Sequence, residues 1–344
     1  MNLKNDIAHR VLISFIYVLI ANELQAQTGG NHAFSFIDIS QSPRITGLGS
    51  VNITLSDGNM FLSNPALLNE NLNGQASFNH YFYYSGIQYN SFTYVQNFSE
   101  TGTWGIGIQQ AGYGSIDAYD PSGNSLGEVN AGEFAVILGN SQKAGNFTVG
   151  GNLKLAFSDI ATYRASAIMT DIGIVFNHPN SDFTAGFMIR NLGFIIKDYT
   201  QSSGSSVPFD VRTGISFKPQ HMPFRFSMTI QKLTHGNILY YNGQLYANQD
   251  EPHTFDKVFS HVVLGAELII NKNLSFFGGY NHLIRRELRQ QQASGGAGFS
   301  YGMLLAIKAF SLSYAGAHYH VAGGTHHLGL SVNVSSLYKR KKIN

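Results

Sequence analysis

The chain has 344 residues, with 37 glycines, 13% aromatic residues and only 12% charged residues, about half the charged share of an average globular protein. A net charge of +2 without a basic stripe or recognition motif argues against nucleic-acid binding, and the lack of cysteine excludes disulfides, thiol catalysis, cysteine-ligated metals and a lipoprotein anchor. Low charge, abundant glycine and no run of eighteen apolar residues after residue 21 are typical of a transmembrane β-barrel rather than a helical membrane protein.

The first 26 residues have the pattern of an export signal. Lys4 and Arg10 are basic, residues 11–21 form an apolar stretch too short to span a bilayer, and Ala26 is a small residue at the expected cleavage position. We therefore expect residues 1–26 to be a signal peptide, with a buried core helix as the alternative.

Residues 27–73 lack the long alternation of the later sequence. Ser-Pro, Asp-Gly and Asn-Pro steps interrupt short apolar pieces, which predicts an extended stretch with short helical turns rather than barrel wall. Pro65 after Asn64 fits a helix start, with Asn64 as the N-cap and Pro65 in the first helical position.

From residue 74 onward apolar and polar residues alternate, which predicts β-strands. Fourteen strands are expected, at 74–84, 86–97, 101–113, 128–141, 145–158, 162–177, 182–194, 207–218, 222–232, 257–271, 273–283, 293–303, 306–318 and 324–334. This pattern predicts an all-β protein, a 14-stranded antiparallel transmembrane barrel over residues 74–338, followed by a basic periplasmic tail at 339–344.

The alternation also assigns an inner and an outer face. In 145–158, Phe147 and Leu153 share one face, and Asn152 and Lys154 share the other. A charge facing lipid at mid-depth would cost about 2–4 kcal/mol, so the charged face must point inward. The expected lumen charges are Lys154, Asp171, Arg190, Asp210, Arg212, Arg225 and Glu267. Their mixed signs favour ion-paired filling over a charge-selective path.

A soluble all-β protein is the alternative to a barrel in a membrane, because it would also alternate. Its outward face, however, would carry charges, whereas here one face stays apolar over most strands. The longest connections, 114–127, 195–206, 233–256 and 284–292, follow odd-numbered strands, and the connections after even-numbered strands are short. Bacterial barrels have short periplasmic turns, so we expect an outer-membrane barrel with periplasmic termini and extracellular long loops.

The segment after the signal carries the most specific motifs: Phe34-Ser35-Phe36, Ser42-Pro43-Arg44, Gly47-Leu48-Gly49 and Asn64-Pro65-Ala66-Leu67. It resembles the start of the PorV/PorQ group of outer-membrane proteins from type IX secretion systems. The Asn-Pro-Ala tripeptide is also similar to one in the FadL long-chain fatty-acid transporters, so the tripeptide alone does not choose between the two. The motif residues singled out are Arg44, Gly47, Gly49, Asn64, Pro65 and Ala66.

The resemblance implies a FadL-like barrel with residues 27–73 as an N-terminal plug. It also implies a place in the cell-surface attachment complex, where the barrel holds a peripheral PorZ-like protein near sortase-like PorU and barrel PorV proteins, among outer-membrane lipid and lipopolysaccharide. The alternative function is FadL-type transport of hydrophobic small molecules, which requires an apolar lumen pocket and a gap in the wall. No enzyme activity and no cofactor are expected, since no catalytic or nucleotide-binding motif occurs.

Arg44 is expected either to pair with an inward acidic residue or to lie solvated at the periplasmic rim. The acidic residues considered are Asp171, Asp210, Glu267 and Glu133. The aromatic loop 233–256 is a candidate docking surface, with folding over the barrel mouth as the alternative. Its candidate docking residues are Tyr240, Tyr241, Tyr246 and Phe255.

Two further groups near the outer end have weaker implications. His318, His320 and His326 flank the last turn and have ligand-like spacing for Zn²⁺ or Ni²⁺, but no acidic residue joins them, which favours solvated histidines and no metal. The arginines of the 284–292 loop are either solvated or in contact with lipopolysaccharide phosphates, which guanidinium groups bind bidentately. They are Arg285, Arg286 and Arg289.

Overall fold

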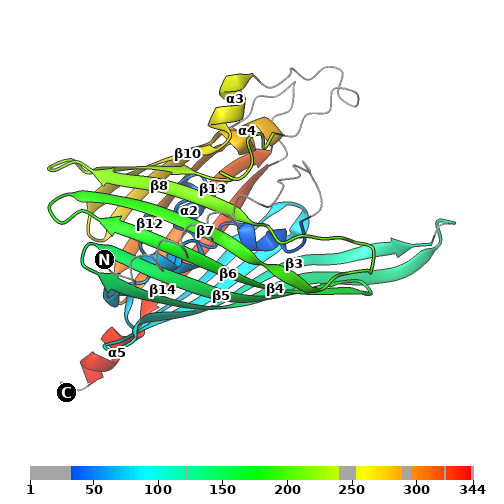
Figure 1. The fold of residues 1–344 in the computed structure, drawn as a ribbon, viewed down its shortest axis with the longest axis horizontal. Coiled ribbons are helices and arrows are strands. Elements are labelled where there is room, and N and C mark those ends of the chain that lie inside the picture. The colour runs from blue at the N-terminus through cyan, green and yellow to red at the C-terminus, as the bar shows by residue number, and fades with distance from the viewer. Residues whose placement is uncertain (1–31, 121, 240–252, 289–295, 321–322, 342–344) are drawn as a thin grey trace, which may run out of the picture.

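The protein is a closed barrel of fourteen antiparallel strands, in which each strand pairs with its chain neighbours and β1 closes the wall against β14. The computed structural model describes residues 32–341 except 121, 240–252, 289–295 and 321–322. The predicted fold class, strand number and antiparallel order are confirmed. Figure 1 shows the strands wrapped around the blue N-terminal segment.

The wall strands are β1 (Gln75–Phe82), β2 (Gln88–Phe98), β3 (Gly102–Tyr119), β4 (Ser125–Ala144), β5 (Phe147–Ile160), β6 (Tyr163–Asn177), β7 (Asp182–Lys197), β8 (Asp210–Lys218), β9 (Phe224–Ile230), β10 (Val262–Asn271), β11 (Leu274–Asn281), β12 (Phe299–Ile307), β13 (Phe310–His320) and β14 (Gly323–Asn333). The helices before the wall are short: η1 (Ser35–Asp38), α2 (Pro43–Gly47), η2 (Met60–Leu62), η3 (Pro65–Leu67) and η4 (Glu70–Leu72). The later helices are η5 (Tyr84–Gly86), α3 (Thr254–Phe259), α4 (His282–Leu288) and α5 (Val334–Lys341). Within the described residues, no helix is long and apolar enough to cross a membrane.

The outer surface of the wall is apolar. Along β5, Phe147 is 49% exposed and Leu153 is 48% exposed, whereas Lys154, on the opposite face, is only 1% exposed. The alternation read from the sequence therefore separates an outward apolar face from an inward polar one. A closed wall leaves no unpaired strand edge in hydrocarbon, so this surface fits a membrane-spanning barrel and not a soluble protein.

Several predicted boundaries are wrong, and three of them show why. The expected loop 114–127 is mostly strand, because β3 and β4 continue as a hairpin well beyond their neighbours. Residues 257–259 were expected in a strand but end helix α3. The turn expected at Leu304–Leu305 lies inside β12, and the chain turns at Lys308 instead, where φ is 57°; a run of apolar residues there hides the alternation. Helix α4 also covers residues 282–283, which were expected in a strand, and most of the expected loop 284–292.

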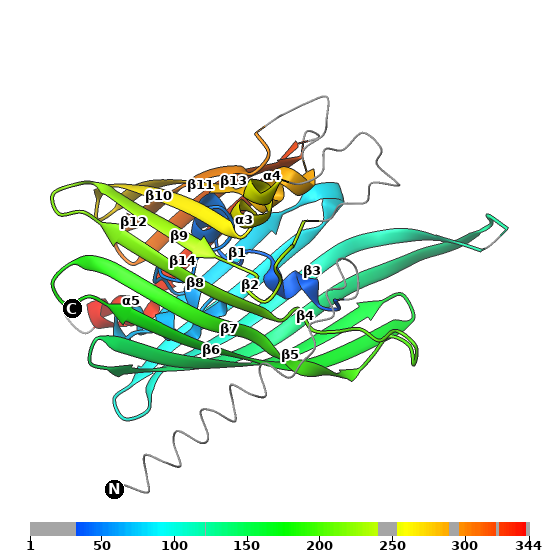
Figure 2. The ribbon, with the colours of Figure 1, turned by 45° about the horizontal axis from the view of Figure 1, so that its top comes forward.

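The two ends of the barrel differ. We call the end with β7–β8, β9–β10 and β11–β12 connections the long-loop end, and the opposite end the short-turn end. Figure 2 shows α3, α4 and the projecting β3–β4 hairpin at the long-loop end, and α5 at the other. The described chain begins at the long-loop end, where the Ala33 N–H donates to the Ser206 carbonyl at 3.0 Å. The expectation that both termini lie beside the short turns stays a prediction, because residues 1–31 lie outside the described residues.

Candidate functional site

The lumen is occupied by residues 33–72, which we call the plug. The plug runs from the β7–β8 loop at the long-loop end down to η4, which leads into β1 at the short-turn end. Its side chains form the core of the molecule: Ile37, Ile53, Met60 and Phe61 are all fully buried. A chain segment with only short helical turns is thus held by packing and hydrogen bonds to the inner wall.

The Asn64-Pro65-Ala66 motif makes a capped helical turn against the wall. The Asn64 side chain accepts from the Ala66 N–H at 3.1 Å and donates to the Ile53 carbonyl at 2.9 Å, as the predicted N-cap requires. Gly150 of β5 makes the room, because a Cβ there would lie 2.5 Å from the Pro65 carbonyl carbon. The motif is therefore a wall-contacting corner of the plug.

Gly47 and Gly49 form the second close approach between plug and wall. A Cβ on Gly47 would lie 2.4 Å from the Phe277 ring, and Gly49 has a φ of 95° that side chains rarely adopt. Gly279 of β11 faces the same stretch, and a Cβ there would lie 2.1 Å from the Gly49 nitrogen. Plug and wall backbones touch here, which explains the need for glycine on both sides.

One ion-pair cluster joins α2 to the wall near the short-turn end. The Arg44 guanidinium lies 2.8 Å from the Glu267 carboxylate, and Arg225 of β9 lies 3.0 Å from the same oxygen. Arg225 also reaches Asp182 at 3.3 Å. Arg44 thus pairs with one of the four acidic residues considered and is not solvated at a rim. Glu133, another of the four, accepts instead from the Tyr113 hydroxyl.

A second cluster begins at a bulge in the wall where β6 meets β7. The register shifts between Thr170 and Ile172, and the Asp171 carboxylate accepts from the Asn191 N–H at 2.8 Å in place of a ladder partner. Lys154 lies 2.7 Å from Asp171 and donates to the Asn191 side chain at 2.8 Å. Because Lys154 and Asp171 are almost completely buried, each depends on the other for its charge to be tolerated.

The same cluster extends to the start of the plug. Asp38 of η1 lies 3.3 Å from Arg190 and 4.0 Å from Arg212, and Arg212 pairs with Asp210. With Lys154 and Asp171 included, three cations face three carboxylates. All seven charges expected in the lumen lie on the inner side of the wall, and they bind the plug and one another.

Several residues of this interior were not identified from the sequence. Asp38 and Thr46 lie in the plug, where no periodicity shows which way a side chain points. Thr46 is hydrogen-bonded to His327 at 2.8 Å, and the His327 ring stacks on Tyr81 with centroids 4.4 Å apart. The alternation of β14 predicts that the His327 side chain points inward. It does not reveal that Thr46 of the plug is its partner.

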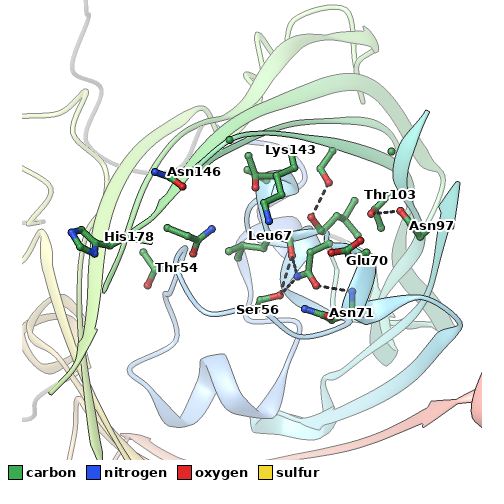
Figure 3. Close-up of a pocket in the computed structure, with 18 of the residues that line it drawn as sticks. Thr54, Ser56, Leu67, Glu70, Asn71, Asn97, Thr103, Lys143, Asn146 and His178 are labelled. Carbon is green, nitrogen blue, oxygen red and sulfur yellow. Dashed lines mark hydrogen bonds between the residues drawn. The ribbon is translucent and has the colours of Figure 1, made fainter. Parts of the chain in front are cut away.

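A polar cavity of about 510 Å³ lies between the plug and the wall at the short-turn end. Figure 3 shows Ser56 and Leu67 of the plug at a cavity that is also lined by Thr103 and Lys143 of the wall and by His178 of the β6–β7 turn. Some of the polar residues that line the cavity are hydrogen-bonded to one another. Asn69 donates to Ser56 at 2.6 Å, and Thr103 donates to Asn97 at 2.9 Å. Amides and hydroxyls dominate the lining, which suits a hydrated mouth rather than a catalytic site.

A second hollow, of about 590 Å³, lies on the apolar outer face across β8 to β12. Outward side chains such as Phe217, Phe226 and Leu264 border it, and small residues form its floor. The wall is continuously paired beneath it, from β9 through β12. The hollow is therefore a lipid-facing groove and not an opening into the lumen.

Helices α3 and α4 contact each other at the long-loop end, away from the lumen charges. Asp256 accepts from the His282 ring at 2.9 Å and lies 3.7 Å from Arg286, which joins the two helices. Partial burial of Asp256 by itself would raise its pKa, but the His282 hydrogen bond and the Arg286 charge outweigh it and hold the pKa below its usual value. Arg286 is thus engaged in an ion pair, whereas Arg289 lies outside the described residues.

Of the candidate docking residues, the structure describes only Phe255. Its ring is 59% exposed and stacks on Phe259 with centroids 4.1 Å apart. The tyrosines Tyr240, Tyr241 and Tyr246 lie outside the described residues. Phe255 therefore presents an apolar surface to whatever lies beyond the barrel end.

The histidines of the last hairpin do not gather around one point. His326 is hydrogen-bonded to the Tyr314 hydroxyl at 2.8 Å on the outer face, and His318 lies beside the Tyr301 ring. His320 is placed in β13 opposite Gly323 by its backbone register. Across the described part of the chain, no group of three histidine or acidic residues is arranged to hold a metal ion.

No protein-family model matches the chain, and no curated protein matches its sequence. Among solved structures, the chain is similar to the CymD monoaromatic hydrocarbon channel, with a TM-score of 0.47 and 11% identity over 87% of this chain and 97% of that one. The TodX deltaS2S3 mutant monoaromatic hydrocarbon channel gives 0.49 and 10% identity over 85% and 97%, respectively. A Pseudomonas aeruginosa FadL homologue gives 0.45 and 8% identity over 85% and 98%. At these scores and identities, none of them indicates what this chain binds.

Proposed function

We propose that the chain is an outer-membrane barrel that anchors a peripheral surface protein, as a component of the type IX secretion attachment complex, without catalysis. The observation that carries this proposal is the plugged lumen. Residues 33–72 fill the barrel interior, and buried ion pairs fasten them to β7, β8 and β10. A barrel filled in this way offers binding surfaces at its ends rather than a path through its middle.

The charge balance of the interior supports the same proposal. A conduction path for ions requires a ring or stripe of one sign, exposed to water. Here Lys154, Arg190 and Arg212 are matched by Asp171, Asp210 and Asp38, and all but Asp38 are nearly fully buried. These groups neutralise one another and serve to hold the plug.

The resemblance of residues 34–68 to the PorV/PorQ group supplies the proposed setting. In that setting the long-loop end faces the cell exterior, and the proposed partner is a PorZ-like peripheral protein, near PorU-like and PorV-like proteins and lipopolysaccharide. The exposed ring of Phe255 and the projecting β3–β4 hairpin are at this end, so both are placed to touch such a partner.

The test is native purification of a tagged chain from its own outer membrane in mild detergent. We expect a large surface protein to co-purify in near-stoichiometric amount and to be released by high salt more readily than by added detergent. An unrelated tagged barrel, expressed at the same level, is the control. Recovery of the barrel alone, with a hydrophobic small molecule bound to it, would contradict the anchoring role.

FadL-type transport is the second candidate, favoured by the apolar groove over β8 to β12. The groove lies directly outside the place where Gly49 contacts Gly279, so only one layer of backbone separates it from the plug. Transport further requires that this wall opens. Retention of a radiolabelled hydrocarbon by purified barrel in proteoliposomes, compared with empty vesicles, tests this candidate, and equal retention by both excludes it.

A further inference from the structure

The β3–β4 hairpin extends beyond the neighbouring strands of the wall. The last β2–β3 pair joins Gln88 to Gly112, and the last β4–β5 pair joins Ala131 to Ile160. The β3–β4 pairing continues to Tyr119 opposite Ser125, with register shifts between Gly112 and Ser115 and between Ala118 and Tyr119. Residues 113–119 and 125–129, which we call the ribbon, therefore form two strands beyond the barrel, and Figure 2 shows them projecting from the long-loop end.

Both outer edges of the ribbon lack a backbone partner among the described residues. At about 3.4 Å per residue, the seven residues on the β3 side present roughly 20 Å of strand edge. Proteins usually protect such an edge with lysine, because it can pair with another chain. The stretch from 113 to 131 contains no lysine or arginine. The edge is thus available for pairing and unprotected by positive charge.

The two faces of the ribbon have different chemistry. Ile116 lies directly opposite Val129 on one face, and Asp117 lies directly opposite Glu128 on the other. The carboxylates of Asp117 and Glu128 are both exposed and form no salt bridge within the described part of the chain. Like charges directly opposite each other destabilise a strand pair, so this face favours an incoming cation.

Apolar side chains near the ribbon tip are also exposed. Tyr119 is 61% exposed and Leu126 is 67% exposed. Near the tip, the Asp120 carboxylate accepts from the Ser122 and Asn124 N–H groups at 2.8 Å. Asp120 thereby links the end of β3 to the start of β4, next to the register shift between Ala118 and Tyr119.

We infer that the ribbon is a docking edge for an extended basic segment of the partner protein, which adds a strand to it by β-augmentation. Backbone hydrogen bonds supply the contact along the edge. The incoming strand alternates basic and apolar residues, with its cations beside Asp117 and Glu128 and its apolar side chains beside Ile116 and Val129. The inference rests on the proposed function, since it names the surface with which the barrel holds its partner.

The test uses the purified full chain in detergent micelles and defined peptides as probes. The first probe is a ten-residue peptide of alternating lysine and valine, and the second has glutamate in place of lysine. We expect only the lysine peptide to bind, measured by fluorescence anisotropy, and to protect the backbone amides of 113–119 or 125–129 from hydrogen exchange. Binding should weaken with added salt, because the charges are exposed.

A matched pair of variants separates the ribbon from general negative charge. Asp117→Asn/Glu128→Gln should weaken lysine-peptide binding about three- to tenfold, the range expected for two exposed ion pairs. Asp159→Asn, which removes a carboxylate from the wall next to the hairpin base, should change binding less than twofold. Equal binding of the two peptides, or binding without protection of ribbon amides, would overturn the inference. Protection of the ribbon amides from hydrogen exchange by millimolar Ca²⁺ alone would overturn it too, because Asp117 and Glu128 would then form a cation site.

The failure of this inference is distinguishable from failure of the proposed function. If the ribbon variant still co-purifies the same surface protein as the parent chain, the anchoring role stands and the ribbon is not the docking edge. If the parent chain captures no surface protein while the lysine peptide protects the ribbon, the edge binds basic strands and the attachment role is wrong.

Discussion

The Arg44 guanidinium of the plug and the Glu267 carboxylate of β10 lie 2.8 Å apart, although 223 residues separate them in the chain. Arg225 of the wall lies 3.0 Å from the same carboxylate oxygen. Glu267, with a side chain only 2% exposed, is therefore neutralised by one cation from the plug and one from the wall. This arrangement makes Glu267 one of the buried wall groups that fasten the plug near the short-turn end.

Replacing Arg44 should loosen the plug without opening the wall. Arg44→Ala removes one charged hydrogen bond and leaves Arg225 to neutralise Glu267, so we expect a loss of about 1.5–3 kcal/mol. The melting temperature of the solubilised barrel should fall, and protease should cut within residues 33–72 sooner. Arg164→Ala, which breaks the exposed pair with Asp159, is the control and should change stability by no more than about 1 kcal/mol. Unchanged melting and unchanged plug proteolysis in Arg44→Ala would show that the contact does not hold the plug.

The Lys154–Asp171 pair should show strong coupling, because both side chains are shut off from water. Lys154→Met leaves a buried carboxylate without its cation, which costs about 3–5 kcal/mol. Lys154→Met/Asp171→Asn removes both charges while the new amide can still accept from the Asn191 N–H, so at least half of the loss should be recovered. Urea unfolding of the parent, the two single variants and the double variant gives the coupling energy. Additive losses would mean that the two charges do not depend on each other.

The wall could be predicted because lipid imposes a strict rule on it. Each outward residue must be apolar, so charged residues such as Lys154 and Glu267 reveal the inner face by parity alone. Outside the bilayer, outward residues no longer have to be apolar. Residues 113–119 lie beyond the last β2–β3 pair and carry Asp117 and Ile116 on faces that both meet water, which is why their strand character was missed.

The plug could be predicted only in part. Asn64 and Pro65 form a local cap, and local hydrogen bonds can be inferred from neighbouring residues. The partners of Asp38 and Thr46 come from strands far away in the sequence, and the plug has no periodicity that would point their side chains. Wall glycines such as Gly150 gave no signal either, because a glycine in a strand does not reveal what packs against it.

Two adjacent glycines of β5 provide a test of plug packing with an internal control. Gly150→Ala would place a Cβ 2.5 Å from the Pro65 carbonyl carbon and 2.6 Å from the Ala66 nitrogen, so the motif must move away from the wall. We expect a loss of at least about 1–3 kcal/mol, as for an overpacked core, and faster plug proteolysis. Gly151→Ala faces away from the plug, with its nearest atom at 3.6 Å, and should be neutral or slightly stabilising. Equal melting temperatures for the two variants would contradict the observed packing of the motif.

The contact between α3 and α4 should weaken in acid. The pKa of Asp256 is held low in the folded protein by His282 and Arg286, so its carboxylate stabilises the contact above the unfolded-state pKa of about 3.9, and this stabilisation is lost as the pH falls through the lower folded value. Pepsin, which is active in acid, should therefore cut the described residues 253–288 slowly at pH about 5 and progressively faster below pH about 4. Asp256→Asn should already be cut faster at pH about 5 and should show a smaller change below it. Asp159→Asn, placed in the wall, should follow the parent protein. If Asp256→Asn and the parent have the same pH dependence, the carboxylate does not join the two helices, and Phe255 loses the support that fixes its position at the barrel end.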